Sequence, residues 1–117
     1  MTPFGRRLRE LRRHRGRRLK DMAQALGVSE AYLSALEHGH RGRPAGGLVQ
    51  QVSAYFNLAW DDVDELRRLA ELSHPRVVVD TSGLDPMATE LANRLAETIA
   101  TLDPRTLEDL LARLAKP

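Results

Sequence analysis

The sequence predicts an all-α protein with five helices in a first domain, then a short extended segment and two further helices. Three observations predict this class. Apolar residues recur three and four positions apart in successive windows, which is the spacing of amphipathic helices. Glycines and N-cap residues separate these windows. Only one β-branched run, residues 76–80, could form a strand, and a single strand cannot pair with itself.

The first three expected helices are short and follow one another closely. Residues 4–14 combine apolar side chains with several arginines, which predicts an amphipathic helix with a basic outer face. Gly16 ends this helix, because glycine readily takes the left-handed conformation after a helix. Residues 19–26 repeat the apolar spacing, and Gly27 stops this second helix. Ser29 is a favourable N-cap for a third helix over residues 29–38.

A loop and two more helices complete the expected first domain, residues 1–74. Residues 38–47 are rich in Gly and Arg without apolar periodicity, so we expect an exposed loop. Apolar spacing predicts a fourth helix from Leu48 and a fifth from Trp60, closed by a His-Pro pair. The expected inward positions of the fifth helix are Val63, Leu66, Leu69, Ala70 and, as a further candidate, Leu72.

The remaining residues, 75–117, predict a linker or short strand and two leucine-striped helices, which start at Asp85-Pro86 and Asp103-Pro104. The valine run either extends as a linker or pairs with the same run of a second copy. The two helices that follow it either fold back onto the first domain or form a partner surface. Because they carry more apolar surface than so short a segment easily buries, we expect dimerisation here.

Charge is divided unevenly along the chain, although the formal net charge is only +2. Residues 1–47 hold 11 Arg and Lys against 4 Asp and Glu, whereas residues 48–117 hold 7 against 12. Only the front half therefore suits a polyanion. Composition alone leaves nucleic acid, anionic lipid and a merely solvated basic face as alternatives.

Composition also excludes several classes of protein. No apolar run approaches the roughly 20 residues of a membrane span, and the N-terminus lacks the apolar segment of a signal peptide. The 117 residues contain no cysteine, which excludes disulfides and zinc fingers and fits a reducing compartment. We therefore expect a cytoplasmic protein with no membrane partner.

The order of the first three helices suits DNA recognition. Two short helices joined by a Gly-containing turn, after a basic helix and before a Gly/Arg loop, can lay one helix across a DNA groove. The residues concerned are Phe4-Gly-Arg-Arg-Leu-Arg-Glu-Leu-Arg12, Leu19-Lys-Asp-Met-Ala-Gln-Ala-Leu-Gly-Val-Ser29 and Tyr32-Leu-Ser-Ala-Leu-Glu-His-Gly39. Over residues 4 to about 60 the chain resembles the XRE family of Cro-type, lambda-repressor-like helix-turn-helix domains. The resemblance implies that the helix at 29–38 reads the major groove.

The resemblance also implies which side chains meet DNA bases. Four positions on the outer face of the third helix match base-contacting positions: Glu30, Ala31, Ser34 and Ala35. Glu30 can accept from a cytosine amino group, and alanine can pack on a thymine methyl. Because Arg, Asn and Gln are the usual bidentate readers, loop arginines and DNA shape are alternative sources of specificity.

Phosphate-contacting positions are implied at the start of the second helix, along the third helix and in the loop after it. They are Arg18, Lys20, Ser29, Tyr32, His38, His40, Arg41 and Arg43. Tyr32 has two open interpretations, a phosphate-binding hydroxyl or a half-buried core ring. Each arginine taken singly could instead be a solvated surface charge.

Structural roles are implied for two further pairs of residues. Arg12 and Glu37 match a buried ion pair that ties the first helix to the end of the third, with two exposed charges as the alternative. Ala23 and Gly27 match small residues that let two helices approach closely. Other chemistries have weak signals: the two loop histidines lack a neighbouring carboxylate or thiol, and no nucleophilic triad is recognisable. We expect no cofactor, no metal and no enzyme activity.

Together these features predict a sequence-specific regulator of transcription that binds double-stranded DNA, with repression favoured because no sensor domain or activation surface is evident. We expect a homodimer, because one recognition helix reads only about half a site. The main alternative is an antitoxin that masks a toxin through residues 75–117 and autoregulates its operon. A third is an architectural protein that binds DNA without specificity.

Overall fold

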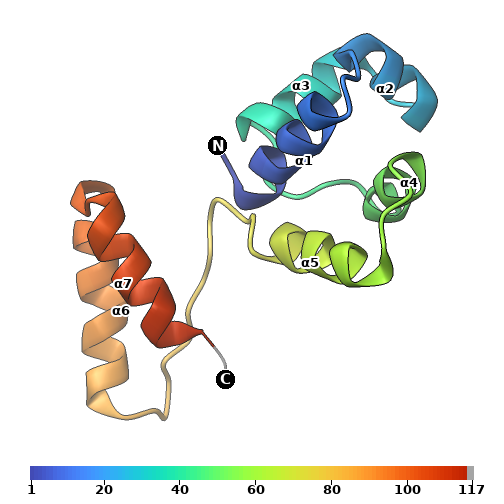
Figure 1. The fold of residues 1–117 in the computed structure, drawn as a ribbon. Coiled ribbons are helices and arrows are strands. Elements are labelled where there is room, and N and C mark those ends of the chain that lie inside the picture. The colour runs from blue at the N-terminus through green and yellow to red at the C-terminus, as the bar shows by residue number, and fades with distance from the viewer. Residues whose placement is uncertain (116–117) are drawn as a thin grey trace. The chain divides into compact units, whose positions relative to one another are not determined.

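The computed structural model describes residues 1–115 and shows two compact units, Met1–Val77 and the residues from Val78 onward (Figure 1). Unit 1 contains α1 (Pro3–His14), α2 (Leu19–Leu26), α3 (Glu30–His38), α4 (Leu48–Tyr55) and α5 (Trp60–Glu71). Unit 2 contains α6 (Pro86–Thr98), the 3-10 helix η1 (Ile99–Thr101) and α7 (Pro104–Leu114). No strand occurs within residues 1–115, so the expected all-α class is confirmed.

Side-chain caps fix where three of the helices begin. Ser29 Oγ accepts the backbone N–H of residue 32 at the start of α3, at 3.0 Å. Asp85 and Asp103 cap α6 and α7 in the same way, each followed by a proline at the first helical position. The N–H of Thr106 lowers the pKa of the Asp103 carboxyl by hydrogen bonding to its charged form. All three expected helix starts are therefore confirmed.

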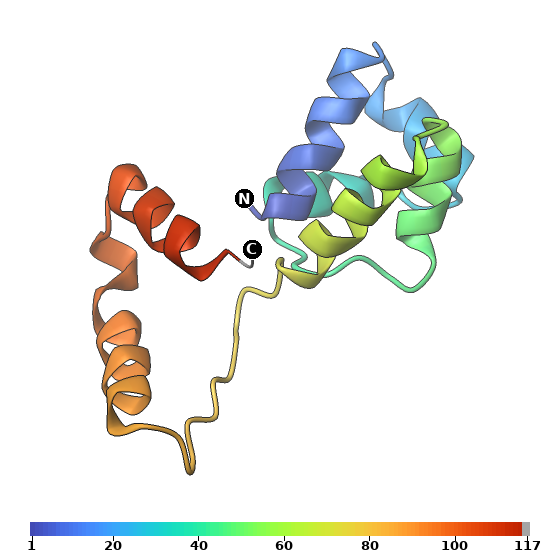
Figure 2. The same ribbon diagram turned by 60° about the horizontal axis from the view of Figure 1, so that its bottom comes forward.

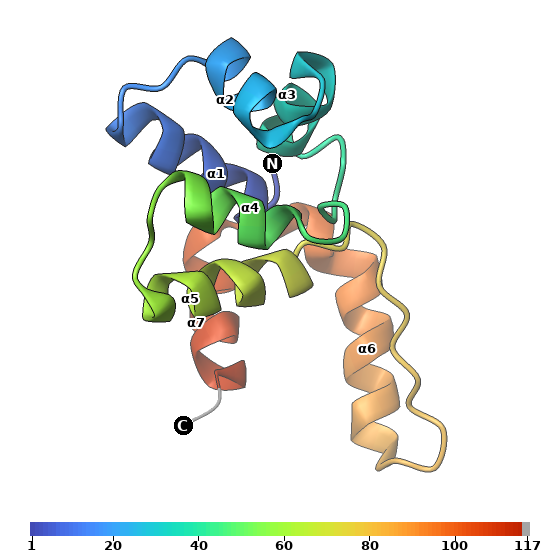
Figure 3. The same ribbon diagram turned by 90° about the vertical axis from the view of Figure 1, so that its right-hand side faces the viewer.

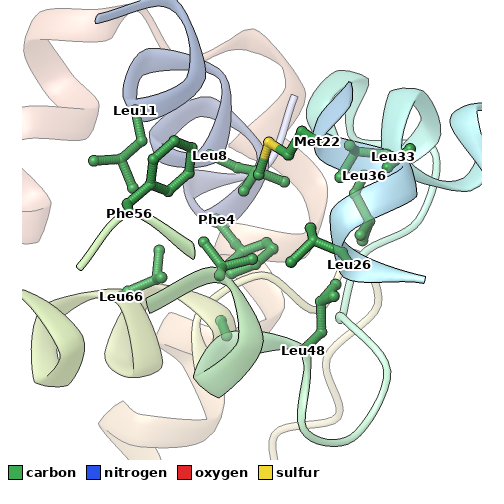
Figure 4. Close-up of a cluster of buried hydrophobic side chains, with 13 residues drawn as sticks. Phe4, Leu8, Leu11, Met22, Leu26, Leu33, Leu36, Leu48, Phe56 and Leu66 are labelled. Carbon is green, nitrogen blue, oxygen red and sulfur yellow. The ribbon is translucent and has the colours of Figure 1, made fainter. Parts of the chain in front are cut away.

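One apolar core holds the five helices of unit 1 together (Figure 4). Its buried members are Phe4, Leu8, Leu11, Met22, Ala23, Leu26, Leu33, Leu36, Leu48, Val52, Phe56, Leu66 and Ala70. The expectation for Leu72 is wrong, because this residue follows the last turn of α5 and its side chain is 53% exposed. Of the other expected positions, Leu66 and Ala70 are buried as expected, and Val63 and Leu69 are half-buried.

The helices of unit 1 form a small bundle. Helix α1 packs against α3 and also against α5, and Figure 2 shows α1 and α5 side by side. Helix α4 lies between α2 and α5 (Figure 3). The α1–α3 crossing is tightest at Gly5, where a Cβ would overlap the carbonyl oxygen of Leu36. Glycine inside a helix costs about 1 kcal/mol relative to alanine, and here that cost allows two backbones to touch.

Ser73 ties the end of unit 1 to its beginning. Its side chain is only 2% exposed, and its Oγ accepts the backbone N–H of Phe4 at 3.0 Å while donating to the carbonyl of Leu69 at 2.6 Å. The segment after α5 is therefore part of the first compact unit, which reaches Val77, beyond the boundary at residue 74 expected from sequence.

Unit 2 differs from unit 1 because none of the residues in α6, η1 or α7 is buried. In Figure 2 its two long helices leave the Ile99–Thr101 corner at a wide angle. The valine run that precedes them is extended and has no strand partner in the single chain, and Val78 is 91% exposed. Within one copy of the chain, the valine run is thus a linker and not a strand.

The joint between α1 and α3 is an ion pair. Arg12 Nε donates to Glu37 Oε2 at 2.7 Å and Arg12 Nη2 to Glu37 Oε1 at 3.0 Å, a bidentate arrangement. The Glu37 side chain is 1% exposed and that of Arg12 is 16% exposed. Arg12 Nη1 also donates to the carbonyl of Arg17 at 3.1 Å, which fixes the turn into α2. Hydrogen bonding to Glu37 raises the pKa of Arg12.

Substitution of Arg12 by alanine tests this joint. Because Arg12→Ala leaves the Glu37 carboxylate buried without its partner, we expect the free energy of unfolding to fall by roughly 3–5 kcal/mol. Arg13→Ala, an exposed neighbour on the same helix, is the matched control and is expected to change it by less than about 0.5 kcal/mol. Urea denaturation followed by circular dichroism measures both. Equal effects of the two substitutions would contradict the buried ion pair.

Candidate nucleic-acid interface

A tight left-handed turn sets the angle between α2 and α3. Gly27 follows α2 with φ +72°, and the N–H of Val28 bonds to the carbonyl of Ala23 at 3.0 Å. A Cβ on Gly27 would meet nothing within 4 Å. The expectation that Gly27 lets helices approach is therefore wrong, because the turn needs its backbone conformation and not its small size. Ala23, in contrast, is buried between helices as expected.

Helix α3 buries one face and exposes the other. Leu33, Leu36 and Glu37 face the core of unit 1. At 100° per residue, positions 31, 34, 35 and 38 lie on the opposite side. The four expected base-contacting residues are Glu30 and Ala31, which are exposed, and Ser34 and Ala35, which are half-buried. The outer face is therefore small and shallow, with short side chains along most of its length.

His38 is the largest polar side chain on this outer face, one turn beyond Ser34. Its ring is exposed, and its Nδ1 lies 2.8 Å from the carbonyl oxygen of Ser34. Because a carbonyl can only accept, Nδ1 carries the proton and Nε2 is the acceptor of the neutral ring. The sequence suggested a phosphate contact for His38, whereas the structure places it in line with the expected base-contacting positions.

Tyr32 combines the two interpretations that the sequence left open. Its ring is partly buried against the core of unit 1. Its hydroxyl oxygen accepts the backbone N–H of Ala45 at 2.8 Å, so it joins α3 to the loop between α3 and α4. The hydroxyl proton is not used in this bond and can still donate to an acceptor such as a phosphate oxygen.

The loop after α3, residues Gly39–Gly47, is called the arginine loop below. Its basic side chains His40, Arg41 and Arg43 are exposed, as the sequence suggests. The backbone N–H groups of His40 and Arg41 both bond to the carbonyl of Ala35, at 2.9 and 3.3 Å. These bonds bring the expected phosphate-contacting residues of the loop next to the C-terminal end of α3.

The start of α2 offers a second group of polar donors beside α3, against which α2 packs. Arg18 is the N-cap residue but makes no side-chain cap, so the first N–H groups of α2 lack a side-chain acceptor. Arg18 instead holds Asp21 with bonds of 2.8 and 3.3 Å, which lower the pKa of the Asp21 carboxyl. Lys20, in the first turn of α2, is exposed. Such a helix start can bind an anion.

Three residues that hold backbone segments of unit 1 together, Gly42, Gly5 and Ser73, were not identified from the sequence. Gly42 sits against Ser73 and Pro75, about thirty residues further along the chain. Gly5 could have been noticed, because glycine inside an apolar helical pattern is costly and indicates close packing. Ser73 gives no such signal, since a serine after a helix is ordinarily exposed.

Among residues 1–115, no three His, Cys, Asp or Glu side chains lie together as metal ligands would. The rings of His38 and His40 stack with centroids 6.4 Å apart. None of the described helices is long and apolar enough to cross a bilayer.

Comparison with known proteins places this geometry in context. The HTH-type transcriptional regulator DdrOP3 of Deinococcus deserti is 44% identical over 59 residues, which cover 50% of this chain and 45% of that protein. The uncharacterized HTH-type transcriptional regulator RghRB of Bacillus subtilis (strain 168) is 35% identical over 63 residues, 54% of this chain and 45% of that protein. The chain thus matches less than half the length of these relatives.

A solved structure titled as a complex of SinR protein and SinI protein aligns with 95% of this chain and 93% of that chain, at 22% identity and a TM-score of 0.47. The family model described as "Helix-turn-helix domain" matches residues 3–72, which include all of α1 to α5. The resemblance to XRE-like DNA-binding proteins is therefore supported, and the chain belongs to the helix-turn-helix domain family.

Proposed function

We propose that the protein is a sequence-specific DNA-binding regulator of transcription that inserts α3 into the major groove. The observation that supports this most strongly is the exposed outer face of α3, with exposed basic side chains in the segments before and after it in the chain. Arg18 and Lys20 lie at the start of α2, and Arg41 and Arg43 lie in the arginine loop. Such groups suit contacts with the phosphate backbones that border a groove.

Base reading in this proposal is divided between α3 and its surroundings. Glu30 accepts from a cytosine amino group, and the methyl groups of Ala31 and Ala35 pack on thymine. His38 supplies one acceptor at the far end of the helix. Because these contacts are few, the phosphate contacts and the shape of the DNA contribute a large part of specificity. Repression is the favoured outcome, since it requires only occupancy of a site.

Selection from a pool of duplexes with randomised sequence tests this function. We expect the protein to enrich one motif. We expect the enriched duplex to bind at least about 100-fold more tightly than a scrambled duplex; specific binders generally reach roughly 10³–10⁷. Fluorescence anisotropy at fixed salt measures both affinities. Equal binding of the two duplexes would support the architectural alternative and overturn specific regulation.

Salt dependence tests the role of the arginine loop. If Arg41 and Arg43 each contact a phosphate, the slope of log K against log salt is expected to become shallower by about 0.9 for each arginine replaced by alanine. Binding to the enriched duplex should weaken more than binding to the scrambled duplex, because contacts from a restrained loop depend on the sequence-dependent path of the phosphate backbone. Arg68→Ala, on the exposed side of α5, removes the same charge and is the control. A slope that changes equally in all three variants would contradict these contacts.

We further propose that unit 2 joins two copies of the chain. Helices of 13 and 11 residues are marginal alone, yet α6 and α7 bury no side chain within one copy. Leu91, Ile99, Leu111 and Leu114 are each more than half exposed. A second copy is the occupant we favour, because two-fold symmetry also presents two recognition helices to adjacent half-sites.

Truncation after Val77 tests the dimer, because this cut keeps all of unit 1. We expect the full chain to have the mass of a dimer by light scattering and the truncated chain that of a folded monomer. The truncated chain should also lose most of its affinity for a two-half-site duplex. A truncated chain that remains dimeric would place the interface in unit 1. A truncated chain with a much lower melting temperature would show that α6 and α7 fold back onto unit 1.

The same exposed surface favours one alternative function, that of an antitoxin whose unit 2 covers a different protein. The two proposals differ in the mass of the purified chain. A dimer that melts in one cooperative transition favours the regulator. A monomer whose unit 2 becomes protected from hydrogen exchange only when a co-encoded protein is added would favour the antitoxin.

A further inference from the structure

We propose that Tyr32 and Gly42 are positioning residues, which hold the arginine loop in one conformation so that Arg41 and Arg43 face the phosphate backbone before DNA arrives. This inference rests on the proposed DNA-binding function and adds a specific mechanism to it. A loop rich in glycine and arginine is expected from sequence to be flexible. Three anchors within unit 1 restrain it instead.

The first anchor is the carbonyl of Ala35 in the last turn of α3. It accepts the N–H of His40 at 2.9 Å and that of Arg41 at 3.3 Å. These two bonds tie the start of the loop to the last turn of α3, where Gly39 turns the chain with φ +79°. The backbone of Arg41 is therefore fixed relative to the recognition helix.

The second anchor is a close contact at Gly42, the residue between the two arginines. A Cβ here would overlap Cδ of Pro75 and would lie 2.8 Å from the carbonyl oxygen of Ser73. The φ of Gly42 lies outside the left-handed region. Glycine is therefore required here because there is no room for a Cβ, and not because of the backbone conformation. The loop backbone rests directly on the segment that follows α5.

That segment, Ser73–Pro75, is attached to the core of unit 1 through Ser73. Ser73 is 2% exposed, and its Oγ bonds to the N–H of Phe4 and to the carbonyl of Leu69. Phe4 is a fully buried member of the core. The segment on which Gly42 rests is thus held to the core at the residue whose carbonyl oxygen faces Gly42.

The third anchor is Tyr32, whose hydroxyl accepts the N–H of Ala45 at 2.8 Å. Gly42 and Ala45 lie on either side of Arg43, so the backbone that carries this arginine is held at both ends. Ordering a flexible loop on binding costs both backbone and side-chain entropy, which lowers the affinity. A loop that is already ordered avoids the backbone part of this cost.

The chain contains a matched pair of glycines for testing this inference. Gly46 belongs to the same loop, also lies outside the left-handed region, and would have nothing within 4 Å of a Cβ. Gly42→Ala must displace the loop from its seat, whereas Gly46→Ala adds the same methyl group in open space. Tyr32→Phe removes the third anchor without adding any atom.

The experiment measures binding of the full-length variants to the duplex enriched from a random pool, over a range of salt concentrations. We expect Gly42→Ala and Tyr32→Phe each to weaken binding roughly 3- to 10-fold and to make the salt slope shallower by up to about one. Gly46→Ala is expected to bind as the wild type does. Placed in an Arg41→Ala/Arg43→Ala background, Gly42→Ala should have little further effect, because the side chains that it misplaces are gone.

Two results would overturn the inference: Gly42→Ala and Tyr32→Phe bind with the wild-type slope, or their effects persist in full without the two arginines. Thermal melts accompany each variant. If Gly42→Ala does not fold, Tyr32→Phe decides the question, since it introduces no clash. A wild-type protein that binds no duplex in a salt-dependent way would refute the proposed function itself, which is a distinguishable outcome.

Discussion

Glu37 carries a carboxylate into the interior of unit 1, where only strong hydrogen bonds offset the loss of water. Arg12 supplies two of these bonds and uses its remaining nitrogen to hold the carbonyl of Arg17. One guanidinium group thereby fixes α1, α3 and the turn into α2 with respect to one another. Gly5, about two turns earlier on α1, lets the backbone of α1 touch that of α3 at Leu36, next to Glu37.

The sequence predicted the helices well because their signals are local. Apolar spacing, glycine stops and Asp-Pro or serine caps all act within a few residues, and the observed helices follow them closely. Contacts between distant segments left no such pattern. The bond from Phe4 to Ser73 spans 69 residues, and the seat of Gly42 on Pro75 depends on how the finished bundle closes. The structural reason for Gly27 was also misjudged, because spacing cannot distinguish a left-handed turn from a close approach.

The two units differ in how much of their apolar surface is buried within one copy of the chain. Unit 1 encloses its apolar side chains in one core, with Glu37 and Ser73 buried and hydrogen-bonded. Helices α6 and α7 of unit 2 also begin at side-chain caps, yet none of their side chains is buried in a single copy. Caps stabilise a helix by about 1 kcal/mol each and do not replace a core. A stable unit 2 therefore requires apolar surface from outside itself, which is the reason for proposing a second copy as its partner.

The composition of α3 gives the arginine loop particular importance. Ala31, Ser34 and Ala35 offer little hydrogen bonding to base edges, so discrimination by α3 alone is weak. An exposed arginine on a flexible loop would add affinity for any DNA but little selectivity. An arginine held in one place contacts phosphate well only where the backbone has the matching path, and that path depends on sequence. Under the proposed function, restraint of the loop lets a recognition helix with short side chains distinguish one DNA site from another.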